Sequence, residues 1–316
     1  MSGKILVLGA AGRLGYAAAE AFRMAGWTVT SLVRPGGAHR APRGTKVVET
    51  IDRLEAIAAA RGADVVLHAL NPPFKTWRRM ALAHAYSAIE VAETAGATLM
   101  FPGNLYNYGA GMPSVIDEST PMQPTTRKGD IRVEIEQRMQ EAAERGVRTI
   151  VLRAGDFFGS GRGAWLDLVI TKQLGRNEVT YPGPLDVVHE WAYVPDLAAA
   201  MVRLAGARER LGVFETFGFP GHAVTGRTLV DAIAKAIGRD SRDLRVRQMQ
   251  WWMIKALAPF FALPRELSEL DYLWKVPHRI AGDKLKAMIG EVPHTPLDTA
   301  VARALKAMSA TTQRSK

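Results

Sequence analysis

The sequence predicts an α/β fold in which a doubly wound parallel sheet carries a smaller, mostly helical carboxyl-terminal lobe. Three observations predict it. The first half of the chain alternates short apolar runs with helical patterns, which is typical of parallel strands joined by helical crossovers. These runs are almost continuous in Val, Leu and Ile, as burial on both faces of a sheet requires. The length of 316 residues suits one large domain with an appended lobe better than two equal domains.

The expected elements follow one another in a regular order. Strands are expected at 4–8, 28–33, 46–48, 64–69, 98–101 and 148–152, and helices at 16–25, 54–60, 76–95 and 130–145. Beyond residue 153 glycines and prolines punctuate the chain, yet 187–194, 195–204 and 213–217 still read as a late strand, helix and strand of the same sheet. We therefore expect a first domain over 1–155, completed by about 186–217, and a substrate lobe formed by 156–185 and 218–316.

The first strand leads straight into three glycines spaced by three residues, Gly9, Gly12 and Gly15, and then into a helix. A side chain at Gly9 or Gly12 would keep the backbone away from a pyrophosphate, and a residue larger than glycine at Gly15 would push the helix off the strand. The amides at the helix start then face the anion. This order predicts a Rossmann-type domain that binds NAD(P), with a substrate lobe over the carboxyl ends of the strands.

Two arginines favour NADP(H) over NAD(H) as the cofactor. An NAD site usually places an acidic residue at the end of the second strand, but here that strand ends at Arg34, and Arg13 lies inside the glycine turn. Two guanidinium groups can bind a 2′-phosphate in bidentate fashion, and Arg40 and Arg43 follow in the next loop. The alternative is that Arg34 is a solvated residue before a turn.

Composition excludes several classes of protein and chemistry. The chain has no cysteine, which removes disulfides and thiolate catalysis, and its seven histidines show no spacing typical of metal ligands. The net charge of +10 is scattered rather than gathered in a basic run, so no nucleic-acid partner is expected. The apolar stretch 251–263 is too short to span a bilayer, so no membrane partner is expected. It is interpreted as helices that close the core of the lobe, with a dimer contact or a substrate wall as alternatives. No signal peptide precedes the first strand, and we expect a cytoplasmic protein.

With the glycine turn in place, the segments 64–69 (DVVLHA), 191–198 (WAYVPDLA) and 152–161 complete a resemblance to the extended short-chain dehydrogenase/reductases, of the NAD-dependent epimerase/dehydratase type. The resemblance covers nearly the whole chain. It implies a small-molecule substrate and permits a homodimer. The residues expected to bind the cofactor are Gly9, Ala11, Gly12, Arg13, Leu14, Gly15, Arg34, Asn71 and Arg132.

The resemblance breaks at the catalytic positions. Members of the family use a Ser or Thr after the fifth strand and a Tyr-x-x-x-Lys pair on the next helix, and here these positions align with Asn104, Lys128 and Arg132. Asn104 can donate an amide hydrogen bond to a carbonyl oxygen. Lys128 is expected as the proton donor, since burial and the cation Arg132 one turn away favour release of its proton, and Arg132 is expected to hold the ribose hydroxyls. Tyr106 is a substitute proton donor. The alternative is that Lys128 and Arg132 form an exposed basic helix start.

Three functions remain open from these residues. The first is an NADP-dependent reductase of a small carbonyl or conjugated substrate. The second is a nucleotide-binding regulator or sensor without turnover, since the family tyrosine is missing. The third is a nucleotide-sugar epimerase or dehydratase, which Asp156 disfavours because its carboxylate would repel the substrate diphosphate. His189 either faces the pocket or is a satisfied interior histidine.

Overall fold

The computed structural model describes residues 2–73, 76–161 and 163–313. Within these residues the largest sheet has seven parallel strands in the order β11-β7-β5-β4-β1-β2-β3. The chain reverses its winding direction between β1 and β4, which is where sheets of this kind bind ligands. The strands are β1 (Lys4–Leu8), β2 (Thr28–Val33), β3 (Lys46–Glu49), β4 (Val65–His68), β5 (Thr98–Gly103), β7 (Thr149–Arg153) and β11 (Phe214–Gly218).

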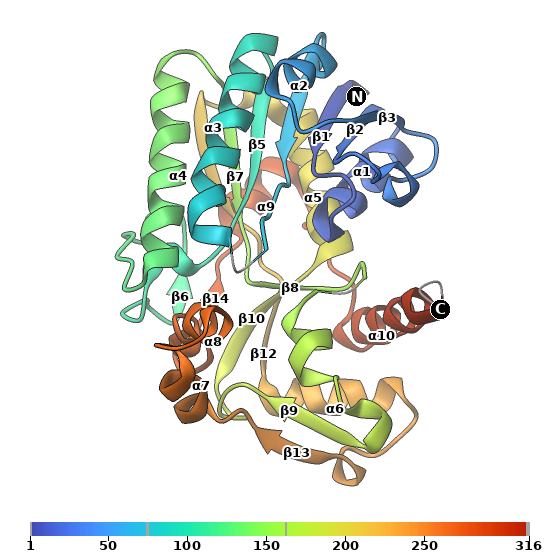
Figure 1. Cartoon of the computed structure of the whole chain (residues 1–316), viewed down its shortest axis with the longest axis vertical. Helices are drawn as coiled ribbons and strands as arrows, with labels where there is room; N and C mark the ends of the chain where they lie inside the picture. Colours follow the sequence, from blue (N-terminus) through green and yellow to red (C-terminus); the bar gives the residue numbers. More distant parts are fainter. Residues whose placement is uncertain (1, 74–75, 162, 314–316) are drawn as a thin grey trace.

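Helices cover both faces of this sheet, as Figure 1 shows. One face packs against α1 and α5, and α9 lies against α5; the other face carries α2, α3 and α4 in succession. Two apolar cores result, one on each side of strands that are themselves buried, which agrees with the continuous apolar runs in the sequence. The helices are α1 (Arg13–Met24), α2 (Arg53–Ala60), α3 (Trp77–Ala95), α4 (Arg127–Glu144), α5 (Val194–Ala207) and α9 (Asp283–Ile289).

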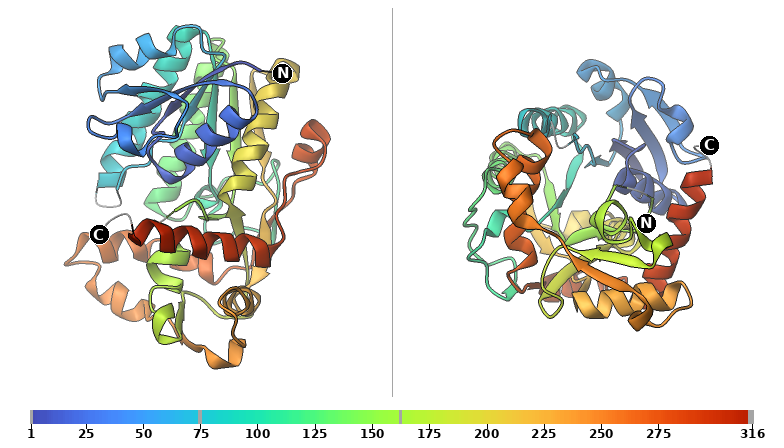
Figure 2. Two further views of the ribbon diagram at one scale, coloured as in Figure 1. Left: turned by 90° about the vertical axis from the view of Figure 1, so that its right-hand side faces the viewer. Right: turned by 60° about the horizontal axis from the view of Figure 1, so that its bottom comes forward.

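The second lobe lies at the carboxyl ends of the large sheet's strands (Figures 1 and 2). Its core gathers aromatic side chains such as Trp191, Trp274 and Tyr181. The long helix α10 (Leu297–Gln313) packs on α6 (Gly226–Ala236), and α7 (Trp251–Leu257) packs on α8 (Ala262–Ser268). The lobe's strands are β6 (Val115–Ile116), β8 (Asp156–Phe158), β9 (Glu178–Tyr181), β10 (Val188–Tyr193), β12 (His222–Thr225), β13 (Arg245–Gln248) and β14 (Arg279–Ile280).

The α/β fold class and the six early strands and four helices are confirmed, with ends that differ by at most a few residues. One expectation was wrong. The late strand at 187–194 does not join the large sheet, because β10 pairs with β8 and β12 in a separate three-stranded sheet. The sequence shows a buried strand there, but burial alone does not specify which sheet receives it. The lobe also contains more strands than expected, since strands of two to four residues leave no periodic pattern.

The apolar stretch 251–263 behaves differently from the core-closing role expected for it. Trp251 is buried, but Trp252 and Phe260 are 68% and 78% exposed, and Phe261 is also exposed. The stretch forms α7 and the start of α8 on the outside of the lobe, so most of its large side chains do not contribute to the core.

Candidate active site

The glycine turn has the geometry that a phosphate-binding turn requires. Gly9 has a φ of +88°, which other residues rarely adopt. A Cβ added at Gly15 would lie 2.3 Å from the carbonyl oxygen of Gly9, so the close approach of α1 to the turn depends on glycine at this position. Gly12 is the N-cap of α1 and provides no side-chain cap, and no acidic residue lies in the first helical turn. The first amides of α1 are therefore left for an anionic ligand.

Arg13 brings a cation with an unused donor to this turn. Its Nη1 atom is buried and has no hydrogen-bond partner among the described residues. Burial lowers the pKa of Arg13, while the charges of Asp167 and Asp156 act against that effect. These carboxylates belong to the segment after β7, so Arg13 lies toward the carboxyl ends of the strands. A phosphate of a dinucleotide would complete its hydrogen bonds.

Arg34 and Arg40 lie on the other side of the turn. Arg34 is exposed directly after β2, and its charge helps to lower the pKa of His84 on α3. Arg40 donates from Nη2 to the carbonyl oxygen of Ala11 at 3.2 Å, which places its guanidinium group against the glycine turn. Of the arginines expected near a 2′-phosphate, Arg40 thus contacts the glycine turn, and Arg13 has Asp167 and Asp156 as neighbouring charges.

Leu14 and Asn71 are two further residues that are expected to bind the cofactor. Leu14 is buried in the core between α1 and the sheet, so its amide rather than its side chain is available. Asn71 is exposed after β4, and its Oδ1 accepts a hydrogen bond from Nε1 of Trp77 at 3.1 Å. This contact links the segment after β4 to the start of α3.

Asn104 and Tyr106 follow β5 at the same edge of the sheet. Asn104 accepts the Tyr106 backbone amide through Oδ1 at 3.1 Å, which leaves its amide nitrogen to donate to a ligand. Burial, helped by the charge of Asp156, raises the pKa of Tyr106 far above its ordinary value, so the phenol keeps its proton. Asn104 therefore has an amide donor, and Tyr106 a phenolic donor, at this edge of the sheet.

Lys128 is not exposed. Its side chain is 1% exposed and forms an ion pair with Glu266 of α8, and its backbone amide donates to Oε2 of Glu269 at 3.0 Å. Arg78 contacts the same two glutamates. The acidic residues that contact Lys128 at the start of α4 thus belong to the lobe. The sequence does not predict this contact, because nothing in the local sequence relates α8 to α4.

Arg132 lies one turn further along α4, sandwiched by aromatic rings. Its guanidinium carbon is 5.4 Å from the ring centroid of Trp77 and 5.3 Å from that of Phe101. Burial lowers its pKa, and Nε has no hydrogen-bond partner among the described residues. Its charge also helps to lower the pKa of buried His68 to about 3. Arg132 is therefore a half-buried cation whose Nε is a buried, unused donor, which fits the expected contact with ribose hydroxyls.

A further pair of titratable side chains lies on two strands of the lobe. Nε2 of His189, on β10, is 3.0 Å from Oδ2 of Asp156, on β8. His189 is buried, whereas the Asp156 side chain is 15% exposed. The carboxylate thought to repel a diphosphate is thus engaged with an imidazole. Neither the position nor the spacing of these residues predicts the contact, which follows from the pairing of β8 with β10.

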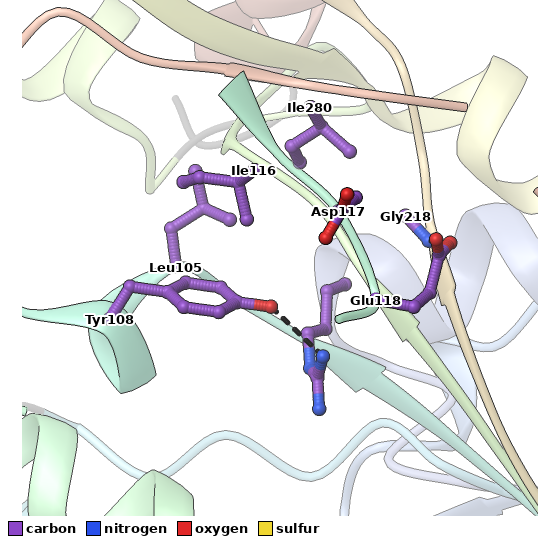
Figure 3. Close-up of a pocket in the computed structure, with 8 residues that line it drawn as sticks. Leu105, Tyr108, Ile116, Asp117, Glu118, Gly218 and Ile280 are labelled. Carbon is purple, nitrogen blue, oxygen red and sulfur yellow. Dashed lines mark hydrogen bonds between the residues drawn. The ribbon is translucent and has the colours of Figure 1, made fainter. Parts of the chain in front are cut away.

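Behind these residues a second buried ion pair fixes the end of β7. Arg153 binds Glu136 of α4 at 2.6 Å and donates from Nη1 to the hydroxyl of Tyr108 at 2.9 Å. Figure 3 shows this hydroxyl pointing toward the guanidinium group, with Leu105, Ile116 and Ile280 around it. The recess there holds only about 10 Å³, too little for anything larger than one water molecule. Tyr108 is therefore held by Arg153 beside a recess that is too small for a substrate.

Two classes of site receive no support from the described residues. No group of three or more His, Asp or Glu side chains is arranged to hold a metal ion in 2–73, 76–161 and 163–313. None of the helices in these ranges combines the length and the apolar character that crossing a bilayer demands.

The residues present fit a nicotinamide dinucleotide. The glycine turn supplies open amides, and Arg13 and Arg132 supply buried donors without partners among the described residues. These groups lie at the carboxyl ends of the strands, together with Asn104, Tyr106 and Lys128.

Known proteins resemble this chain along most of its length. Residues 5–217 match the model of the NAD dependent epimerase/dehydratase family. A 3-diazoavenalumate denitrifying reductase from Streptomyces sp is 30% identical over 179 residues, which are 51% of this chain and 58% of that relative. The alignment thus spans little more than half the length of that protein.

Solved structures resemble the whole chain. The UDP-Glc/GlcNAc 4-epimerase of Campylobacter jejuni has 15% identity and a TM-score of 0.74, and covers 98% of this chain and 99% of its own. A UDP-glucose-4-epimerase from Stenotrophomonas maltophila, with bound NAD and formylated UDP-arabinopyranose, has 17% identity and a TM-score of 0.76, with 99% of both chains covered. At such identities the likeness establishes the fold alone.

Proposed function

The chain belongs to the NAD dependent epimerase/dehydratase family, and from this premise we propose that it is an NADP-dependent reductase of a small carbonyl or conjugated substrate. The observation that carries the proposal is an open glycine turn together with two half-buried arginines, Arg13 and Arg132, that each have a buried donor atom without a partner among the described residues. A buried donor without a partner costs free energy, and an anionic or hydroxyl-rich ligand would provide the missing hydrogen bond.

The substrate side of the site suits a carbonyl oxygen. Asn104 has its amide nitrogen left to donate, and Tyr106 keeps its phenolic proton. Lys128 adds positive charge from the start of α4, although Glu266 offsets part of it. When bound, the nicotinamide supplies the hydride, and Arg132 would hold the ribose that carries it.

Arg34 and Arg40 support NADP(H) as the preferred form. Arg34 stands where an NAD site usually has an acidic residue, and Arg40 holds its guanidinium group against the glycine turn. Guanidinium groups bind a phosphate better than they bind a bare diol.

The Streptomyces relative supports reductase chemistry. Its name describes a reductase that removes nitrogen from a diazo compound. A diazo compound is therefore a second candidate substrate class, beside carbonyl compounds. Both classes accept a hydride.

The test begins with calorimetric titration of NADPH and NADH into the purified protein. We expect NADPH to bind at least about 10-fold more tightly, as one charge-assisted interaction provides. The absorbance of NADPH is then followed with small aldehydes, enones and an aryldiazonium salt, and steady oxidation is expected with at least one of them. Lys128→Ala should lower turnover and leave the Kd for NADPH within about 3-fold.

Other outcomes identify the alternatives. Tight NADPH binding without turnover of any probe would favour a sensor. Binding of UDP-glucose with retained NAD would favour a nucleotide-sugar epimerase. If neither coenzyme binds, the proposal fails.

A further inference from the structure

We propose that Asp156 and His189 together hold the proton that a reduced carbonyl oxygen receives, with the Asp156 carboxyl group on the substrate side and His189 as the positioning residue behind it. This inference rests on the proposed reductase function and adds the source of the proton.

The hydrogen-bond partners of His189 carry the argument. Nδ1 lies 3.2 Å from the carbonyl oxygen of Leu273, and Nε2 lies 3.0 Å from Oδ2 of Asp156. Both partners are acceptors, whereas a neutral imidazole has only one N–H. Both contacts can be hydrogen bonds only if Asp156 and His189 together carry a second proton, in addition to the single N–H of a neutral imidazole. That proton resides either on the imidazole, as an imidazolium facing a carboxylate, or on Asp156, as a carboxylic acid donating to Nε2.

The surroundings of His189 suit a shared proton. The imidazole is 2% exposed and stacks on Trp274, with ring centroids 4.2 Å apart and 5° between the planes. A cationic ring over an indole is favourable, and the adjacent carboxylate offsets the cost of burial. His278 lies 4.7 Å away, but burial and the charge of His189 lower its pKa to about 3. His278 therefore stays neutral and does not take the proton.

Asp156 is the more exposed member of this pair, with 15% of its side chain exposed. Burial raises the pKa values of Tyr106, Tyr181 and Tyr272, and the charge of Asp156 adds to this effect in all three. The hydroxyl of Tyr272 is buried without a partner among the described residues. Gly103, the residue before Asn104, pairs with Arg153, three residues before Asp156. Asn104 and Asp156 thus follow neighbouring strands at the same edge of the sheet, and we expect the carboxyl group to face the substrate oxygen that Asn104 would bind. Arg13 on α1 is the cation that interacts with this carboxyl group.

Lys128 is a poorer source of the same proton. Its ammonium group is ion-paired with Glu266, and both side chains are buried. Loss of its proton would leave Glu266 as a buried carboxylate whose partner had lost its charge, which is costly. Asp156 differs from Lys128 in that its side chain is 15% exposed, so water can replace a proton that the pair gives up.

The proposed reduction of a carbonyl group conserves atoms and electrons. A hydride from reduced nicotinamide adds to the carbonyl carbon, the electron pair of the C=O bond moves to oxygen, and oxygen takes the shared proton. The nicotinamide is oxidised, the carbonyl is reduced to an alcohol, and the pair is left as a carboxylate beside a neutral imidazole until water returns a proton. An aryldiazonium cation differs, since hydride replaces N₂ and no proton is consumed. The pair therefore matters for carbonyl substrates and not for diazonium substrates.

The first test detects the protonation state of His189 by NMR and does not require turnover. Protein labelled with ¹⁵N-histidine is examined at pH 7 by long-range ¹H–¹⁵N spectroscopy, and the His189 signal is assigned as the one lost in His189→Gln. We expect either two protonated nitrogens, or protonation at Nδ1 alone together with a ¹³Cγ shift of Asp156 typical of a carboxylic acid in protein that also carries ¹³C-aspartate. Protonation at Nδ1 alone with an ionised Asp156 would mean that no proton lies between the residues. In Asp156→Asn the ring should become neutral with its proton on Nδ1. Protonation of wild-type His189 at Nε2 alone would overturn the inference.

The second test compares two aromatic probes, 4-nitrobenzaldehyde and a benzenediazonium salt, with NADPH as reductant. Asp156→Asn should lower kcat for the aldehyde about 100-fold or more, as loss of a positioned acid does, and change the diazonium rate by less than about 3-fold. His189→Gln should lower kcat for the aldehyde without changing its KM. Asp231→Asn, at an exposed position of α6, is the control.

The outcomes separate the two proposals. Equal losses with both probes in Asp156→Asn would overturn the proton role, even if NADPH binds normally. Failure of the wild-type protein to bind NADPH would reject the reductase proposal, while the nitrogen spectrum would still decide whether the pair holds its proton.

Discussion

The ammonium group of Lys128 and the carboxylate of Glu266 form an ion pair across the junction of α4 and α8, and their side chains are only 1% and 5% exposed. The pair joins the large sheet's layer of helices to the lobe at the proposed active site. Arg78 and Glu269 extend it into a four-residue network. Glu266 and Glu269 supply the negative charge that offsets a lysine at a helix start.

We expect Glu266→Gln to lower the free energy of unfolding by about 3–5 kcal/mol, because it removes the carboxylate charge that pairs with a buried ammonium group. Urea unfolding measures the change. The control is Lys235→Gln, which breaks an ion pair whose side chains are 72% and 50% exposed and should cost less than about 1 kcal/mol. Equal losses in the two variants would contradict the structural role of the buried pair.

Arg34→Ala and Arg40→Ala should each weaken NADPH binding about 10- to 100-fold, because each removes a charge-assisted contact to the 2′-phosphate. NADH binding should change by less than about 3-fold. Calorimetry with both coenzymes provides the ratio, and Arg61→Ala, an exposed arginine at the end of α2, is the matched control. An equal loss of NADPH and NADH affinity would argue against recognition of the 2′-phosphate.

The glycine turn and the early strands are predictable from the sequence because their signals are local. Gly9, Gly12 and Gly15 lie next to the strand and helix that they join, and the buried strands carry unbroken apolar runs. The ion pair of Lys128 with Glu266 joins residues 138 positions apart. The contact between Asp156 and His189 depends on which strands pair, and no local pattern specifies that.

The packing of the stretch 251–263 is likewise not specified by its local sequence. Its composition indicates burial, yet the sequence does not say which helix face meets the lobe. Trp251→Ala should cost about 3–5 kcal/mol, since it empties a site in the lobe core and removes the hydrogen bond from Nε1 to the carbonyl oxygen of Pro182. Trp252→Ala, at an indole 68% exposed, should change stability by less than about 0.5 kcal/mol. Unfolding curves of the two variants test this, and comparable losses would mean that the second indole is covered in solution.

Glu190 makes the stability of the lobe depend on pH. It lies on β10 with 1% exposure, where Oε1 accepts the amide of Gly221 at 2.7 Å and Oε2 accepts that of Ile280 at 3.0 Å. Burial raises its pKa from 4.5 to about 7, although these hydrogen bonds and the charge of Arg279 act in the opposite direction. Between these values the folded protein binds more protons at this site than the unfolded chain does. Its contribution to stability is therefore present at low pH and is lost as the pH rises toward 7.

The expected size of this effect is about 3 kcal/mol over the interval, from the energy of one pKa unit. Glu190→Gln removes the titration, so its free energy of unfolding should fall less between pH 5 and pH 7 than that of the wild type, even though the variant is less stable at pH 5. Buried His68, His222 and His278 have lowered pKa values and contribute the opposite slope in both proteins, so the difference between the two curves isolates Glu190. Parallel curves for the variant and the wild type would show that Glu190 is already ionised in the fold.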